Sequence, residues 1–394
     1  MRGLGALCVL AALGLPASCR YDTDQELSTP DLVRKHGYPA ESHVALTADG
    51  YLLTLHRIPH GRTRPDAGGR PVVFLQHGLL SSSADWVIMG PNTSLAYILA
   101  DEGFDVWMGN VRGNTYSKSH VNLSSSDPLF WRFSWDEMAV FDLPAALDLV
   151  LATTGRRRLF YVGHSMGTSM FFALACTRPD YVGARVELMS ALAPVVFLRH
   201  VRTPMRILSY FAHDYQFLAH FFGANQFLPN NFILRLLARY GCDAITAERK
   251  ICESSIFVLT GFDPQQFNIS LLPVILGHAP AGTSSRTIVH YAQLIQSGQF
   301  KPFDCQEDYK PCYQPPSGRY QLDNISVKVS LHYGDNDWLA TPTDVHALSQ
   351  SLRKVVGVYR VPLPTFNHVD FLWAKDVRAL VYDEVVRLLK QGRG

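Results

Sequence analysis

A serine between two glycines stands near the middle of the sequence, in the segment LFYVGHSMGTSM at residues 159–170. The residues from Gly163 to Gly167 fit the pattern G-x-S-x-G. An apolar run typical of a strand precedes them, and a helix-like stretch follows. In this context a sharp strand-to-helix turn lifts the serine hydroxyl above a sheet. The pattern therefore predicts that Ser165 is a nucleophile, and the alternative is an ordinary turn that contains a serine.

A serine hydroxyl needs a base to act, and the base needs an acid to orient it. In folds with this turn, the acid and then the histidine follow the serine in the chain. Asp337 follows a strand-like run and is the expected acid, with Asp335 as the alternative. His368 comes after the last strand-like run and is the expected base. Both side chains would then stand on loops at strand ends, where they could reach Ser165.

Acyl transfer also needs hydrogen-bond donors for the developing oxyanion. One expected donor is the backbone N–H of Met166, the residue after the serine. The second is the backbone N–H of Leu79, in an early loop that follows a strand-like run. His77 and His164 lie within turns, and we expect them to hold the backbone.

Short apolar runs that end in glycine or a polar turn alternate with helical patterns. The strand-like runs are 72–75, 104–108, 159–162, 188–192, 327–333 and 358–361, and helical patterns include 139–151 and 168–175. This alternation predicts an α/β fold with a mainly parallel sheet covered on both faces. Ligands of such sheets bind at the carboxyl ends of the strands.

One long segment interrupts the alternation. Residues 197–320 show no clear strand periodicity, and we interpret them as a largely helical cap inserted between two parts of one core, 20–196 and 321–394. After Pro229, apolar residues at helical spacing predict a helix. That helix either packs on the core or forms a lid over an apolar site.

The first residues of the chain are typical of a secretory signal peptide. Within residues 1–19, the basic Arg2 precedes a short apolar run and then small residues. The run is too short to span a membrane, and a buried N-terminal helix is the alternative. The net charge is +2, and the charged residues form no long run of one sign. Nucleic-acid binding therefore has little support.

Cysteine spacing fits an oxidising compartment. Cys242 with Cys252, and Cys305 with Cys312, could each close a small loop, although spacing alone does not fix the pairing. Cys176 is then left over in an apolar helix, and we expect a buried thiol.

Four N-x-S/T sequons also fit secretion, and they stand at Asn92, Asn122, Asn268 and Asn324. Other chemistries have little support, because we find no nucleotide-binding loop and no HExxH or CxxC pattern. We therefore expect no cofactor and no metal.

Several runs resemble the acid lipase family, which includes gastric lipase, lysosomal acid lipase and insect relatives. They are PVVFLQHGLL, DVWMGNVRGN, FSWDEMAVFDLPA, YVGHSMGT, LAPV, GFDPQQFN, PAGTSSR and NHVDFLWAKD. The resemblance implies an α/β-hydrolase core with a cap that contains a lid. It implies hydrolysis of triacylglycerols or cholesteryl esters, often at acidic pH, without a metal or colipase. We expect a secreted or lysosomal monomer that acts on lipid at an emulsion or membrane surface.

Carried over residue by residue, the resemblance makes Ser165 the nucleophile, Asp337 the acid and His368 the base, with Leu79 and Met166 as oxyanion donors. It also makes Cys242 and Cys252 the family disulfide, whereas Cys305 and Cys312 are not part of the mammalian pattern. Relatives usually carry Gln where this chain has Met166. Because the donor is a backbone N–H, we expect the oxyanion hole to remain, while substrate preference could change.

The sequence therefore predicts a serine ester hydrolase that cleaves fatty-acyl esters of neutral lipids through an acyl-enzyme. One alternative is a soluble short-chain carboxylesterase with the same triad. The other is a non-catalytic lipid carrier, against which the intact triad argues.

Overall fold

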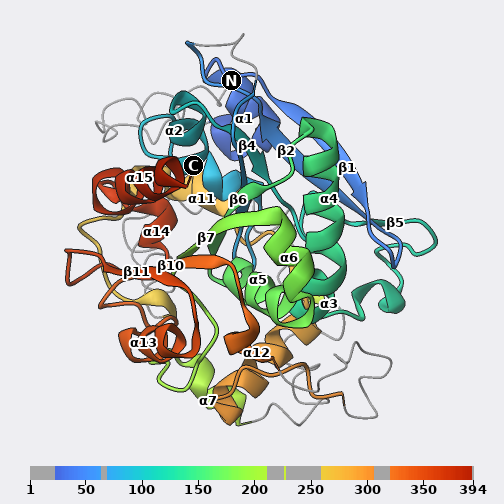
Figure 1. Cartoon of the computed structure of the whole chain (residues 1–394), viewed down its shortest axis with the longest axis vertical. Coiled ribbons are helices and arrows are strands. Elements are labelled where there is room, and N and C mark those ends of the chain that lie inside the picture. Colours follow the sequence, from blue (N-terminus) through green and yellow to red (C-terminus); the bar gives the residue numbers. More distant parts are fainter. Residues whose placement is uncertain (1–22, 64–68, 211–225, 228–258, 306–319, 393–394) are drawn as a thin grey trace, which may run out of the picture.

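The computed structural model describes residues 23–63, 69–210, 226–227, 259–305 and 320–392. Its centre is one large sheet with the strand order β1-β2-β4-β3-β6-β7-β10-β11, and β5 pairs with β2 (Figure 1). The strands are β1 (Glu41–Leu46), β2 (Tyr51–Ile58), β3 (Val72–Gln76), β4 (Asp105–Met108), β5 (Ser119–His120), β6 (Leu159–His164), β7 (Val186–Leu192), β10 (Lys328–Tyr333) and β11 (Val355–Arg360). Neighbouring strands from β4 to β11 are parallel, which confirms the predicted mainly parallel sheet.

The burial of each strand explains whether it could be predicted from the sequence. Every residue of β3, β4 and β6 is buried, so each of these strands is a continuous apolar run. The edge strand β11 has no buried residue, and it begins at Val355, earlier than the predicted start at residue 358. The antiparallel pair β1 and β2 was not predicted, because its strands mix polar and apolar residues.

Helices cover both faces of the sheet. In Figure 1, α2, α14 and α15 lie on one side of it, and α4, α5 and α6 lie on the other. The α-helices are α1 (Thr29–Lys35), α2 (Leu95–Asp101), α3 (Trp135–Glu137), α4 (Leu143–Thr154), α5 (Met166–Thr177), α6 (Pro179–Arg185), α7 (Met205–Ser209), α11 (Leu272–His278), α12 (Ser285–Ser297), α13 (Pro342–Ser351), α14 (Asp370–Trp373) and α15 (Asp383–Gln391). The 3₁₀ turns are η1 (Thr23–Gln25), η2 (Ser83–Trp86), η3 (Pro128–Trp131), η5 (Ile269–Leu271) and η7 (Leu322–Asn324), and the π-helical turns are η4 (Met138–Asp142) and η8 (Arg378–Tyr382).

The chain leaves the sheet after β7 and returns at β10, although these two strands are neighbours. Between them, α12 packs against α7 at the lower end of the molecule in Figure 1. The short strands β8 (Gln226–Phe227) and β9 (Thr283–Ser284) pair in a separate small sheet. Two-residue strands show no periodicity, so the sequence did not predict them. The cap predicted at 197–320 lies in this excursion, but residues 211–225, 228–258 and 306–319 are outside the described residues, and the cap stays a prediction.

Several predicted features lie outside the described residues. They are the signal peptide at 1–19, the helix after Pro229, the pair Cys242 and Cys252, and Cys312. Cys305 is disulfide-bonded, and its partner also lies outside the described ranges. Cys176 is a free thiol, partly buried, and burial raises its pKa.

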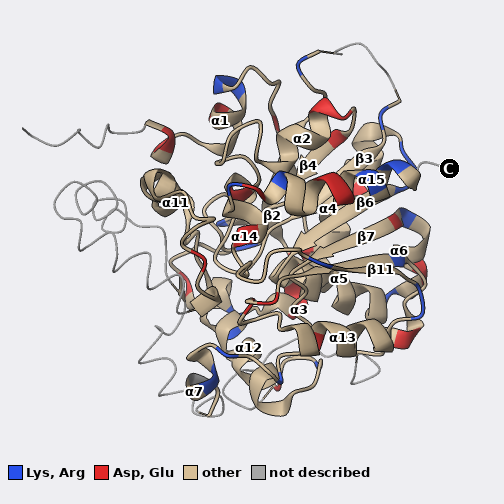
Figure 2. Ribbon diagram, turned by 90° about the vertical axis from the view of Figure 1, so that its left-hand side faces the viewer, with Lys and Arg blue, Asp and Glu red and all other residues tan. Residues whose placement is uncertain are grey.

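Charged residues of both signs are interspersed along the ribbon, as Figure 2 shows. Among the helices that the structure describes, none is long and apolar enough to cross a bilayer.

Candidate active site

Ser165 stands on a strained turn between β6 and α5. Its backbone has φ +52° and ψ −117°, a conformation that non-glycine residues rarely adopt. The glycines on either side allow this turn to pack. A Cβ on Gly163 would lie 2.9 Å from the Gly167 carbonyl carbon, and a Cβ on Gly167 would overlap the carbonyl oxygen of Gln76 at the end of β3. The turn therefore holds Ser165 at the carboxyl ends of the central strands.

Ser165, His368 and Asp337 form one hydrogen-bonded chain. The Oγ of Ser165 lies 2.8 Å from Nε2 of His368, and Nδ1 of His368 lies 2.8 Å from Oδ2 of Asp337. The ionised carboxylate can only accept, so Nδ1 donates to it and Nε2 accepts the serine proton. The other carboxylate oxygen, Oδ1, accepts the backbone N–H groups of Leu339 and Ala340, each at 2.8 Å. These bonds fix the buried carboxylate and, through it, the imidazole.

The alternative acid, Asp335, lies elsewhere. Its carboxylate accepts hydrogen bonds at 2.9 and 3.0 Å from Nε of Arg360, an exposed side chain at the end of β11. The structure thus brings Asp337 to His368 and leaves Asp335 in a surface ion pair.

The two predicted oxyanion donors flank Ser165. Met166 is the first residue of α5. Leu79 follows Gly78, which lies so near the serine that a Cβ on it would be 3.0 Å from the Cβ of Ser165. Neither backbone N–H, of Leu79 or of Met166, donates a hydrogen bond to another residue in the described part of the chain. Gly78 and Met166 thus lie next to Ser165, the N–H groups of Leu79 and Met166 are not used by other described residues, and their oxyanion role stays a prediction.

The Met166 side chain points into the protein core. It is 1% exposed and packs in the main hydrophobic cluster. Met166, where the resemblance implies Gln, is therefore a core residue.

His77 holds the loop that carries Leu79, as predicted for it. Its Nδ1 donates to the carbonyl oxygen of Gly78 at 2.8 Å, and its Nε2 accepts the backbone N–H of Val111 at 3.2 Å and a side-chain N–H of Asn114 at 3.2 Å. Only a neutral imidazole satisfies these partners, and burial lowers the His77 pKa to about 4. Because Gly78 C=O and Leu79 N–H belong to one peptide plane, this bond also orients the Leu79 donor.

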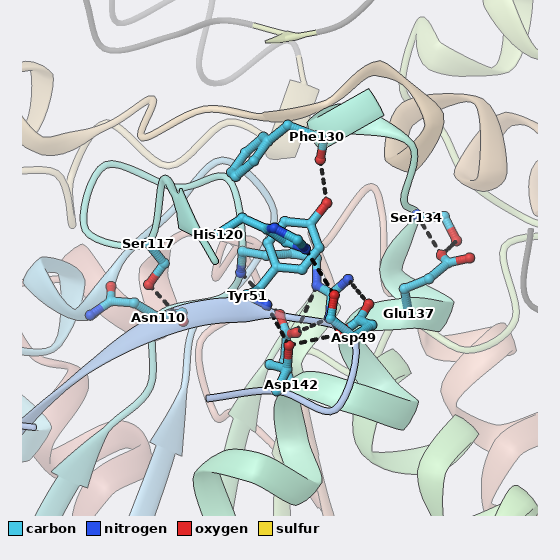
Figure 3. A network of polar contacts seen from close by, with 11 residues as sticks. Asp49, Tyr51, Asn110, Ser117, His120, Phe130, Ser134, Glu137 and Asp142 are labelled. Atoms are coloured by element: carbon cyan, nitrogen blue, oxygen red, sulfur yellow. Dashed lines mark hydrogen bonds and ion pairs between the residues drawn. The ribbon is translucent and has the colours of Figure 1, made fainter. Parts of the chain in front are cut away.

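A buried ion network anchors the loop after β4 that supports His77. Arg112 is 1% exposed, and its Nε donates to Asp142 at 2.7 Å while its Nη1 donates to Asp49 at 2.6 Å. Figure 3 shows Asp49, Asp142 and the ring of Tyr51 converging at this point. The guanidinium lies 3.9 Å from the centre of that ring, a cation–π contact. Burial raises the pKa of Asp142 to about 6 against the opposing effect of Arg112.

His164 also binds the backbone, as expected. Its Nε2 donates to the carbonyl oxygen of His368 at 3.0 Å, and the two rings lie with their centres 5.0 Å apart. Burial lowers the His164 pKa to about 3, so this imidazole is neutral and acts as a support for the His368 loop.

Sequence reasoning missed one supporting segment, Thr260 to Asp263. Its carbonyl oxygens accept hydrogen bonds from both loops that carry the triad. Thr260 accepts the His368 and Trp338 N–H groups at 3.3 and 3.4 Å. Gly261 accepts the Asn367 amide at 2.9 Å, and Phe262 accepts the Asn336 amide at 2.8 Å. The only signal in the sequence was the run GFDPQQFN. None of its residue types indicates that its backbone supports these loops.

Two family models match the chain. The model described as a partial alpha/beta-hydrolase lipase region matches residues 29–90, and the model of the alpha/beta hydrolase fold matches residues 71–375. The second match includes Ser165, Asp337 and His368.

Full-length relatives agree with these models. The chain is 39% identical over 375 residues to gastric triacylglycerol lipase of Bos taurus, covering 94% of this chain and 93% of that protein. It is 37% identical over 391 residues to lipase lipl-1 of Caenorhabditis elegans, covering 98% and 96%. Among solved structures, a thermophilic esterase from Thermogutta terrifontis shares the fold with a TM-score of 0.50 at 14% identity, covering 90% of this chain and 100% of that one. The chain belongs to the acid lipase family of the α/β-hydrolase superfamily, and it is a lipase, a carboxylic ester hydrolase.

Proposed function

We propose that this lipase cleaves fatty-acyl esters of triacylglycerols through an acyl-enzyme on Ser165, with cholesteryl esters as a second substrate class. The observation that carries the proposal is the 2.8 Å approach of the serine Oγ to Nε2 of His368, whose other nitrogen is held by Asp337. This is the arrangement that turns a weak hydroxyl into a nucleophile.

In the acylation step, His368 takes the proton of Ser165 as Oγ bonds to the ester carbonyl carbon. The Leu79 and Met166 N–H groups stabilise the oxyanion of the tetrahedral intermediate. The imidazolium then gives its proton to the leaving alcohol oxygen as the ester C–O bond breaks. Asp337 stabilises the imidazolium throughout.

In the deacylation step, a water molecule replaces the alcohol. His368 takes a proton from the water as its oxygen bonds to the acyl carbon. The second tetrahedral intermediate then collapses, and the bond between the acyl carbon and Oγ of Ser165 breaks. Oγ takes the proton back from His368. The products are a fatty acid and the free enzyme.

The triacylglycerol substrate is supported by the gastric triacylglycerol lipase of Bos taurus, which shares 39% of its residues with this chain over nearly its whole length. Likeness to the Thermogutta terrifontis esterase at 14% identity concerns the fold alone. A lipid at an emulsion or membrane surface is thus the proposed partner. We expect the enzyme to act on it as a monomer.

A secreted or lysosomal location is also part of the proposal. The sequons at Asn92, Asn122 and Asn324 are exposed, and the one at Asn268 is half-buried. The disulfide at Cys305 fits an oxidising compartment as well. Glycosylation at these asparagines, pairing of Cys242 with Cys252 and of Cys305 with Cys312, and removal of residues 1–19 follow as expectations. The inserted cap at 197–320 is proposed to cover the site.

Labelling and turnover test the proposal together. We expect a fluorophosphonate to modify Ser165, and we expect hydrolysis of emulsified triolein to fall to background in Ser165→Ala. Ser169→Ala is a matched control, because Ser169 is a buried serine of the same helix that bonds Val195 and Tyr291. Full triolein activity in Ser165→Ala would contradict the mechanism. Faster turnover of dissolved short-chain esters than of emulsions would favour a carboxylesterase, and failure of the probe to label Ser165 would favour a lipid carrier.

A further inference from the structure

Two buried aspartates outside the triad meet beside the His368 loop. Asp263 and Asp370 are each 1% exposed. Asp263 ends the supporting segment Thr260–Asp263, and Asp370 begins α14, two residues after His368. Neither carboxyl takes part in the proposed chemistry.

Each carboxyl uses one oxygen to hold the loop that carries His368. Oδ2 of Asp370 accepts the Asn367 backbone N–H at 2.7 Å, and Oδ1 of Asn367 in turn accepts the N–H groups of Val369 and Asp370 at 2.9 and 3.1 Å. These hydrogen bonds thus connect the residues on either side of His368 to one another. Oδ2 of Asp263 accepts the Thr365 hydroxyl at 2.9 Å, at the start of the same loop.

The second oxygen of each carboxyl lacks a donor in the described structure. Oδ1 of Asp263 and Oδ1 of Asp370 are both buried, and neither has a hydrogen-bond donor among the described residues. The effect of Asp263 on the pKa of Asp370 includes a hydrogen bond between the two carboxyl groups, which places the groups within reach of each other. Two ionised carboxylates have no proton to share, so this bond requires one protonated oxygen.

The charges around the pair favour that proton. Burial, Asp263 and the nearby Asp337 raise the pKa of Asp370 to about 8, against the opposing hydrogen bond from Asn367. Other titratable groups on the elements around the pair are His368 and His164 on the triad side, Asp85 across α14, and Lys375 and Asp376 after α14. Lys375 donates to the carbonyl oxygen of Gln265 on the protein surface.

We propose that Asp263 and Asp370 share one proton and act as positioning residues that hold His368 in place for catalysis. The proposal rests on the proposed function, in which His368 is the base. The shared proton links the supporting segment to the His368 loop. It works together with the bonds from His368 N–H to Thr260 and from the Asn367 amide to Gly261.

Loss of the shared proton would leave two like charges in a buried site. The repulsion would push the loop away from the supporting segment, and His368 would move relative to Ser165. Misplacement by about 1 Å can cost roughly a hundredfold in rate. The pair thus keeps the triad assembled at acidic and neutral pH and disturbs it at alkaline pH.

The test compares Asp370→Asn and Asp263→Asn with wild type and with Asp335→Asn. An asparagine at either position can keep the bond between the two side chains through its amide N–H, without a proton to lose. Asp335→Asn removes a carboxylate two residues before Asp337 that belongs to a surface ion pair instead. The readout is the rate at which a fluorophosphonate labels Ser165, measured from pH 6 to pH 10.

We expect wild type and Asp335→Asn to lose labelling rate above about pH 8, by up to roughly tenfold per pH unit once the proton is lost. Asp370→Asn and Asp263→Asn should hold their rate over the same range. Folded Asn variants that keep the wild-type alkaline loss would overturn the proposal. A wild-type rate that stays level from pH 8 to pH 10 would overturn it too, even if neither variant folds. If wild type does not label at Ser165 at any pH, the proposed function fails instead.

Discussion

The backbone of Gly167 lies against the carbonyl group of Gln76 so closely that a Cβ at residue 167 would overlap the oxygen. This contact joins the first turn of α5 to the end of β3, and it sets how deeply the Ser165 turn sits on the sheet. A methyl group here must displace backbone on one side. The same displacement would move Ser165 away from His368.

Gly167→Ala should therefore lose both activity and stability. We expect a cost of about 1–3 kcal/mol in the free energy of unfolding, typical of an added methyl in a tightly packed interior, together with a large loss of labelling at Ser165. Urea unfolding and fluorophosphonate labelling measure the two effects. Gly183→Ala is the control, since a Cβ there would meet only the Ser326 hydroxyl, at 3.0 Å. Equal behaviour of the two variants would show that the contact is not needed.

Asp337→Asn should preserve the fold and remove most of the activity. The amide can still accept the Leu339 and Ala340 N–H groups, but it no longer requires Nδ1 of His368 to be the protonated nitrogen. A fall in kcat of about 10³–10⁴-fold is typical of such a change in a serine triad. Turnover of a dissolved ester measures it without effects of the lipid surface. Asp335→Asn should stay near wild type, and a comparable loss in that variant would contradict the assignment of the acid.

The sequence predicted the members of the Ser165–His368–Asp337 hydrogen-bonded chain because their signals are local. A glycine–serine turn after an apolar run and a histidine after the last strand each show in a few neighbouring residues. The contacts of Thr260 and Gly261 with the His368 loop could not be predicted. They use backbone carbonyl groups more than a hundred residues away in the chain, and a carbonyl has no residue type. The role of Met166 was unresolved for a similar reason, because only packing reveals that its side chain faces the core.

His77→Asn should slow catalysis without weakening substrate binding. The rest of the loop is unchanged, but the Gly78–Leu79 peptide loses the hydrogen bond from the imidazole that orients it. Removal of an oxyanion donor costs about 10²–10³-fold, and a misaligned donor should cost less than that. We expect kcat to fall while KM stays close to wild type. His60→Asn is the matched control, since His60 makes the same kind of contact with Gly61 at 2.8 Å, in a surface loop. A change in KM alone would contradict a role in the oxyanion hole.

The same histidine sets an expectation at acidic pH. Because burial lowers the His77 pKa to about 4, the folded protein keeps a neutral imidazole where an unfolded chain, with a pKa near 6.5, would bind a proton. Its contribution to stability is therefore full above about pH 6.5 and is lost as the pH falls toward 4. Protonation of Nε2 would also set it against the Val111 N–H. Activity should persist at pH 5 and fall steeply below pH 4, and a pH–rate profile of turnover checks this. A loss of activity already complete at pH 6 would show that another group sets the acid limit.

Asp370 should make the protein less stable as the pH rises from about 6.5 to 8. Its pKa of about 8 lies above the ordinary carboxyl value, so in this range the folded protein holds a proton that the unfolded chain has lost. A group of this kind stabilises most at low pH, and its contribution falls as the pH rises to its folded pKa. The slope is at most about 1.4 kcal/mol per pH unit, or about 2 kcal/mol across the window. Buried histidines with lowered pKa values, such as His77 and His164, add a slope of the opposite sign near pH 6.5, where the unfolded chain still binds part of a proton, but this slope is common to both proteins and cancels in the comparison. Urea unfolding of wild type and Asp370→Asn at several pH values isolates the effect, because other buried carboxyls contribute equally to both proteins. The difference in free energy of unfolding should shift toward the variant by about 2 kcal/mol between pH 6.5 and 8. Parallel curves would mean that Asp370 is ionised in the folded protein, and the shared proton with Asp263 would then be ruled out.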